Sequence, residues 1–270
     1  MKMTQMTTEQ SEVKDFRYPL RWRQEKVSYS VFHILSSRSH FTYCLLLCTE
    51  RTYPRSLSDI AKHIDQPKLP ELVRRFLYDQ LNPDSANPGA DMPIDECPVF
   101  EGRVSVHHSA TARFYAPSDL CGTGGMHRER IRSAPSWQGR YARRDTVLVW
   151  TDPEQPGMLG MAVGRVFLFF SFTFRDVFYR CALIHWFERV GQGPDDDTGL
   201  WVVRPEYERN GRPSLAAIHI DSIACAAHLV GVYGSGLMPE DIHFSHSLDV
   251  FRTYFVNSYA DHHMNEFLTS

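Results

Sequence analysis

The sequence predicts an α+β protein whose main body is a mostly antiparallel small barrel or bent sheet, flanked by N-terminal helices and a C-terminal helix. Two observations predict this fold class. Short runs rich in β-branched and aromatic residues recur between turn signals from residue 104 to residue 220. No helix-length amphipathic pattern interrupts the stretch between residues 147 and 220, which argues against the alternating strands and helices of a doubly wound fold.

The composition is that of a folded protein without long-range attraction for polyanions. Of the 270 residues, 43% are hydrophobic and 13% are aromatic, and the formal net charge is −3. These values suit one main core, and they require any nucleic-acid surface to come from a local basic cluster. The six cysteines are scattered without a CxxC pair, so we expect reduced thiols and no zinc site.

The sequence contains no pattern typical of a membrane span. The longest mostly apolar run near the N-terminus, Phe41 to Cys48, is far shorter than the roughly 20 residues that a membrane helix needs. It also lies behind a stretch of mixed charge, unlike the apolar part of a secretory signal. We therefore expect a soluble, intracellular protein with no membrane partner.

The first 98 residues divide into an arm and a helical segment. Residues 1–56 are expected to form a poorly ordered arm, because the positions up to Asp15 are polar and low in aromatic residues. Residues 57–98 begin with a helix that Ser56 or Ser58 can cap and that runs through His63, followed by a second helix that Pro70 opens. Four prolines between residues 82 and 98 then predict a connecting loop.

Residues 99–247 are predicted to form the β-rich domain. The expected strands alternate or are continuously apolar, and turn residues separate them. They cover residues 104–106, 147–150, 163–172, 177–187, 199–203 and 215–220. The triplet Phe174-Arg175-Asp176 predicts a hairpin between two of them, and Asn210-Gly211 predicts a further turn.

Residues 248–270 are predicted to form a final helix that packs against the sheet. The prediction depends on apolar residues that recur at helical spacing. They are Leu248, Phe251, Phe255, Tyr259 and Phe267.

The most distinctive segment for function covers residues 127–144 and reads HRERIRSAPSWQGRYARR. It holds six arginines against a single acidic residue, Glu129. Arginine forks suit phosphate groups, and the interleaved aromatic rings suit unpaired bases. The predicted nucleic-acid-binding residues are Arg128, Arg130, Arg132, Trp137, Arg140, Tyr141, Arg143 and Arg144. The alternative is a solvated loop whose arginines pair with the acidic loops at residues 91–96 and 195–197.

Other motifs favour structural interpretations, and we assign no catalytic residue, cofactor or metal ligand. The glycine-rich stretch 116–125 lacks the ending of a phosphate-binding loop, so it predicts a tight turn. The three consecutive aspartates 195–197 predict a solvated turn, because neighbouring residues cannot all converge on one ion. Four aromatic residues could build a cage for a methylated lysine, although core packing is the default expectation for them. These are Tyr179, Trp186, Phe187 and Trp201.

Several stretches together resemble the C-terminal region of Plavaka-type transposases, which are DNA transposon proteins of mushroom-forming fungi. They include LPELVRRFLYDQLNP at 69–83, FYAPSDLCGTGGMHRERIRSAPSW at 114–137, ALIHWFERVGQGPDDDTGLWVVRP at 182–205 and IHIDSIACAAHLVGVYG at 218–234. The sequence VNSYADHH at 256–263 fits as well. The resemblance covers about residues 57–265, and residues before Leu57 have no counterpart in it.

This resemblance implies a DNA-handling protein that works in the nucleus. It also implies that the RNase H-like catalytic core, whose carboxylates hold two metal ions, lies upstream of the region that the chain resembles. We therefore expect a non-catalytic, transposase-derived accessory domain that binds DNA. Its further partners would be chromatin or other transposase subunits.

A second hypothesis comes from a fold-level analogy. The order YRCALIHWFER, TGLWVVRPEY and AIHIDSI looks like that of BAH-type chromatin barrels. The analogy predicts a chromatin or protein interaction module that uses an exposed barrel rim. A third hypothesis is an enzyme whose site the sequence does not reveal.

Overall fold

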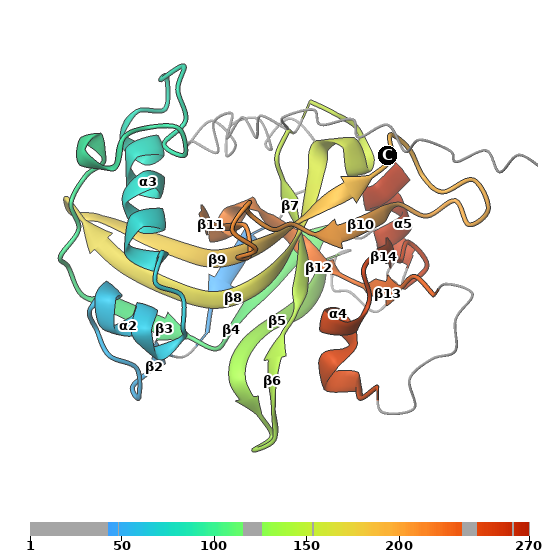
Figure 1. Cartoon of the computed structure of the whole chain (residues 1–270), viewed down its shortest axis with the longest axis horizontal. Helices are drawn as coiled ribbons and strands as arrows, with labels where there is room; N and C mark the ends of the chain where they lie inside the picture. Colours follow the sequence, from blue (N-terminus) through green and yellow to red (C-terminus); the bar gives the residue numbers. More distant parts are fainter. Residues whose placement is uncertain are drawn as a thin grey trace, which may run out of the picture.

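The structure is a computed structural model that describes residues 43–47, 49–115, 126–152, 154–233, 242–260 and 262–269. It confirms an α+β fold in which every strand pairing among these residues is antiparallel. The strands curl into a half-barrel, and helices lie at two sides of it (Figure 1).

A long, bent hairpin forms the spine of the fold. Its strands are β8 (Met161–Phe174) and β9 (Val177–Val190). The predicted turn between them is confirmed, because Arg175 and Asp176 both adopt left-handed backbone angles, with φ of 48° and 63°, as a tight hairpin turn requires. A bulge between Val166 and Leu168 bends the pair.

The remaining strands of the larger sheet pair along this spine. The sheet runs in the order β12-β7-β8-β9-β10-β14-β13, with β11 also on β9, and β3 on β8 and β2. Their bounds are β2 (Thr49–Glu50), β3 (Val104–His107), β7 (Thr146–Trp150), β10 (Val202–Pro205), β11 (Leu215–His219), β12 (Ile223–Ala227), β13 (Leu229–Gly231) and β14 (Tyr254–Val256). The predicted strand at residues 199–203 begins three residues later than expected.

A second, four-stranded sheet has the order β1-β4-β5-β6. Its strands are β1 (Tyr43–Leu46), β4 (Ser109–Tyr115), β5 (Met126–Trp137) and β6 (Tyr141–Arg144). The hairpin of β5 and β6 projects from the body of the molecule (Figure 1). One face of this sheet is anchored in the main core through Ala112, Phe114 and Ile131, which are fully buried.

Both faces of the spine are buried, against two separate cores. One core includes Phe169 and Ile184 and extends to the smaller sheet and the C-terminal helix. The other includes Phe170 and Leu183 and is covered by α2 (Leu57–His63) and α3 (Leu69–Leu81). Successive residues of a strand point to opposite faces, which explains why two nearly continuous apolar runs occupy the centre of the fold.

Both predicted N-terminal helices are confirmed. The side chain of Ser56 accepts a hydrogen bond from the backbone nitrogen of Asp59 and so caps α2. Pro70 lies in the first turn of α3, where a proline disturbs no helical hydrogen bond. The remaining helices are short. They are α4 (Ser247–Val250), α5 (His262–Thr269) and the 3-10 turns η1 (Ile94–Glu96), η3 (Gly157–Gly160), η4 (Ile220–Ser222) and η5 (Phe244–His246).

The prediction of one helix over residues 248–270 is wrong. Residues Tyr254–Val256 form β14, which pairs with both β10 and β13. The edge of β10 offers unpaired backbone groups, and the buried side chains of Tyr254 and Val256 alternate as a strand requires. Of the described residues in this stretch, only those up to Val250, at the end of α4, and those of α5 are α-helical, and Phe267 of α5 packs into the core as expected.

The prediction of a poorly ordered arm over residues 1–56 also needs correction at its end. Strands β1 and β2 occupy part of residues 43–50, because β1 pairs with β4 and buries Cys44 completely. The rest of the arm, up to residue 42, lies outside the described residues. None of the helices that the structure describes is long and apolar enough to cross a membrane.

Candidate nucleic-acid interface

The arginine-rich segment forms the projecting hairpin of β5 and β6. Gln138 and Gly139 make its turn with φ of 53° and 72°, and the backbone nitrogen of Arg140 donates to the carbonyl of Trp137. Along β5, alternate residues point to opposite faces. Arg128 and Arg130 are therefore on the outer face and exposed, whereas Ile131 is on the inner face and fully buried.

The neighbouring strands add two arginines to this outer face. Arg113 of β4 is directly opposite Arg128, and residues directly opposite in a sheet share a face. Arg143 of β6 is opposite Ala134, which has the parity of Arg132. We call the resulting surface the arginine face. It consists of Arg113, Arg128, Arg130, Arg132 and Arg143.

Few acidic groups among the described residues lie on or beside the arginine face. Glu129, the one acid within the segment, turns inward, where its Oε2 accepts a hydrogen bond of 2.8 Å from the backbone nitrogen of Ala226. Among the described residues, the carboxylate of Asp145 lies next to the face, and its Oδ1 is 2.8 Å from Nε of Arg143. Among the described residues, no carboxylate forms an ion pair with Arg128 or Arg130.

The indole ring of Trp137 is not free, because two arginine side chains pack against it. The guanidinium carbons of Arg132 and Arg143 lie 4.6 Å and 5.4 Å from the centre of its indole ring, which is the geometry of a cation–π contact. Partial burial and the nearby Arg143 lower the pKa of Arg132 from its usual value. Asp145 already pairs with Arg143, so the excess positive charge around this ring is that of Arg132, and this charge favours a bound anion.

Three further predicted residues lie away from the arginine face. Arg140 is exposed at the hairpin turn. Tyr141 packs against His243, with ring centres 4.7 Å apart. Arg144 is opposite Ser133 on the other face of the hairpin, and its guanidinium lies 4.3 Å from the centre of the Phe167 ring. Burial and the neighbouring Arg165 lower the pKa of Arg144.

Arg144 and Tyr141 border a small cleft of about 350 Å³ on that other face. Arg165 also lines it and forms a bidentate ion pair with Asp249, at 2.5 Å and 3.3 Å. Two exposed aromatic residues line the cleft, and a third, Phe244, packs against Tyr141 beside it. The three are Tyr141, Tyr207 and Phe244, with exposed fractions of 45%, 58% and 75%.

Among the described residues, no ion pair joins an arginine of residues 127–144 to the acidic loops at residues 91–96 and 195–197. Asp195 accepts hydrogen bonds from the backbone nitrogen and the hydroxyl of Thr198, and these bonds lower its pKa. This is the solvated turn that the sequence predicts. No group of three potential metal ligands occurs among the residues that the structure describes.

The four aromatic residues considered for a cage do not come together. Tyr179 packs in the helix-covered core, with its ring 5.8 Å from that of Phe76. Phe187 lies in the main core. Trp186 and Trp201 are half-buried and pack against the main core. The glycine-rich stretch 116–125 lies outside the described residues.

Sequence reasoning missed Arg113, which lies outside the basic segment. The signal that could have found it is the pairing of the two strands that flank the stretch 116–125, which brings residues 109–115 beside residues 126–132. The arrangement as a whole can bind an extended anion. No protein-family model, curated protein or solved structure matches this chain.

Proposed function

We propose that the chain is a DNA-binding accessory domain of a transposase-derived protein, and that the arginine face is its contact with the DNA backbone in the nucleus. The observation that carries the proposal is a sheet face that gathers five arginines, of which Arg128 and Arg130 are exposed and form no ion pair with a described carboxylate. The transposase origin is supported by the sequence stretches described above.

The spacing of the cations supports contact with a backbone rather than with one small anion. Arg128, Arg130 and Arg132 occupy alternate positions of one strand, so successive Cα atoms on that face are roughly 6.6 Å apart. A row of cations on a twisted strand presents several donors to successive phosphates. Because Trp137 is occupied by arginines, base stacking contributes less than phosphate contact.

The net charge limits the affinity that this face can provide. A chain with a net charge of −3 gains no general attraction to a polyanion. Binding would then be sequence-independent, with a dissociation constant on the order of 10⁻⁴ to 10⁻⁶ M at physiological salt.

The first experiment measures binding of the full chain to a fluorescent DNA duplex by anisotropy, for wild type and for the double variant Arg128→Ala/Arg130→Ala. We expect the double variant to bind at least about tenfold more weakly at low salt, since each lost phosphate contact removes a favourable charge interaction. Both side chains are exposed, so the fold should be unaffected.

The matched control is Arg209→Ala/Arg252→Ala, which removes the same charge from two exposed positions outside the hairpin. It should bind DNA within about twofold of wild type, allowing only for the change in net charge. Equal losses in the two double variants would mean that net charge, rather than the arginine face, governs binding, and the proposal would then fail.

A protein-interaction role is a second candidate, and the exposed aromatic residues around the small cleft favour it. Phe244 and Tyr207 are more than half exposed, and such groups are enriched at protein interfaces. The variant Phe244→Ala/Tyr207→Ala should bind DNA like wild type under the first proposal. If it lost DNA binding while Arg128→Ala/Arg130→Ala retained it, the aromatic surface would replace the arginine face as the functional site.

A further inference from the structure

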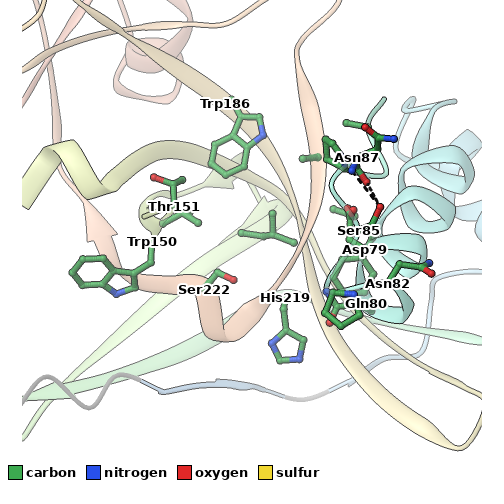
Figure 2. Close-up of a pocket in the computed structure, with 18 of the residues that line it drawn as sticks. Asp79, Gln80, Asn82, Ser85, Asn87, Trp150, Thr151, Trp186, His219 and Ser222 are labelled. Carbon is green, nitrogen blue, oxygen red and sulfur yellow. Dashed lines mark hydrogen bonds between the residues drawn. The ribbon is translucent and has the colours of Figure 1, made fainter. Parts of the chain in front are cut away.

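A larger cleft lies away from the hairpin, between the end of α3 and the ends of β7 and β9. Its volume is about 680 Å³, within the range of sites for small molecules. One side is formed by α3 and the polar loop that follows it, from Asp79 to Asn87. The other side carries Trp150, Thr151 and Trp186 (Figure 2). Residues 215–217 of β11 add apolar surface. We call this the tryptophan cleft.

The charge of the tryptophan cleft is opposite to that of the arginine face. Among the described residues that line it, none is a lysine or an arginine, and two are aspartates, Asp79 and Asp84. His219 also lines it, and its Nδ1 accepts a hydrogen bond from the backbone nitrogen of Asp221. Burial lowers the pKa of His219, which disfavours its charged form. Phosphate and carboxylate groups would find no counter-charge there.

Two buried polar atoms of the wall have no hydrogen-bond partner among the described residues. They are Nε1 of Trp150 and Oγ of Ser222. An indole nitrogen only donates, so its partner must be an acceptor, whereas a hydroxyl can donate or accept. An unsatisfied buried group of this kind costs about 1–3 kcal/mol. Because both atoms are buried in the wall, a ligand in the cleft would remove that cost only if these side chains shift to expose them.

We propose that the tryptophan cleft binds an uncharged nucleoside. A nucleobase offers a flat face to the indole rings and acceptors to Trp150, and a ribose offers hydroxyls to the polar side chains at the end of α3 and in the loop after it. These polar side chains are Asp79, Gln80, Asn82, Asp84, Ser85 and Asn87. The inference is independent of the proposed DNA contact, because it concerns different residues with the opposite charge.

The test measures binding of adenosine, guanosine, cytidine and uridine to the full chain by calorimetry and by tryptophan fluorescence. We expect at least one of them to bind with a dissociation constant below about 1 mM, and its 5′-monophosphate to bind at least about tenfold more weakly because no cation lines the cleft. Failure of all four nucleosides, or equal affinity for the monophosphate, would overturn the proposal. Tighter binding of trimethyllysine or of a neutral disaccharide than of every nucleoside would also overturn it.

Two variants assign the binding to this cleft. Trp150→Phe removes the indole nitrogen and keeps an aromatic ring, and we expect affinity for the nucleoside to fall about tenfold. Trp201→Phe is the matched control, since Trp201 does not line the cleft, and it should bind like wild type. Equal affinity of wild type and Trp150→Phe would contradict the proposed contact.

Ser222→Ala serves as the second variant if Trp150→Phe unfolds, and it should weaken binding about three- to tenfold. Unchanged affinity in Ser222→Ala would count against the proposed orientation of the nucleoside. Arg128→Ala/Arg130→Ala should leave nucleoside binding intact. The failure of one proposal can therefore be told from the failure of the other.

Discussion

The arginine face and the tryptophan cleft of this protein have opposite charge. The face gathers five arginines on the outer side of β4, β5 and β6, whereas the cleft has two aspartates and no cation among its described lining residues. The net charge of −3 conceals this separation. We expect the two regions to bind different ligands. A substitution in one region should weaken binding at that region and leave binding at the other unchanged.

The two regions also differ in how they are attached to the fold. The arginines of β5 stand on an exposed face and depend on buried residues behind them for their alignment. The cleft is built into the wall between sheet and helix, so several of its residues, such as Ile218 and Ser222, are themselves buried. Substitutions of the exposed arginines should therefore affect binding alone, whereas substitutions of buried residues of the cleft should also affect stability.

The largest expected effect on stability comes from the residue behind the arginine face. Ile131 is fully buried on the inner side of β5, and Ile131→Ala should lower the free energy of unfolding by about 2–5 kcal/mol. The neighbouring variant Arg130→Ala should change it by less than about 0.5 kcal/mol. Urea denaturation of the two variants measures the difference. Similar losses in both would show that the arginines are part of the core packing.

A pH-dependent effect is expected in the tryptophan cleft. Burial raises the pKa of Asp79 to about 6, and its Oδ1 accepts a hydrogen bond from the backbone nitrogen of Gly89. A folded-state pKa above the unfolded value means that the folded state binds the proton more tightly, so this group's contribution to stability falls as pH rises from about 4 to about 6. The loss above pH 6 should be between about 1 and 3 kcal/mol.

Asp79→Asn isolates this contribution because the amide keeps an acceptor for Gly89 and cannot ionise. Relative to wild type, the variant should become more stable as pH rises from 4 to 7. Denaturation curves of both proteins at pH 4, 5, 6 and 7 provide the comparison. A difference in stability that does not change with pH would show that Asp79 titrates normally.

The smallest expected effect is a difference in stability between the alanine variants of two buried serines. Oγ of Ser133 donates to the carbonyl of Val166, whereas Oγ of Ser222 has no partner among the described residues. Ser133→Ala should cost about 1–3 kcal/mol because it leaves a buried carbonyl unsatisfied, and Ser222→Ala should cost less than about 1 kcal/mol or stabilise. Thermal melts of the pair check the order. A reversed order would mean that Ser222 already has a partner in the folded protein.

Much of the fold could be predicted from local signals. Ser56 and Pro70 mark the starts of two helices, and Arg175-Asp176 marks the turn of the spine. The start of the final helix could not be predicted from local signals, because Phe251 and Phe255, which lie before it, also fit a helical period. What decides against the helix is the open edge of β10, which lies far from residues 254–256 in the sequence.

The candidate interface was predictable in composition but not in geometry. The alternation of Arg128, Arg130 and Arg132 has the period of a strand, which places three cations on one face. The roles of Trp137 and Arg144 depend on contacts that form only when β6 folds back on β5. The tryptophan cleft joins residues from four separate segments, so no local pattern in the sequence could have indicated it.

The central claim is that the arginine face contacts DNA phosphates, and the salt dependence of binding tests it most directly. The logarithm of the association constant for a DNA duplex should fall linearly with the logarithm of salt concentration, at about 0.9 per phosphate contact. Changing Arg128 and Arg130 to alanine should reduce the magnitude of this slope by about 2, whereas changing Arg209 and Arg252 should leave it unaltered. A slope that is flat in wild type, or the same in all three proteins, would contradict the account.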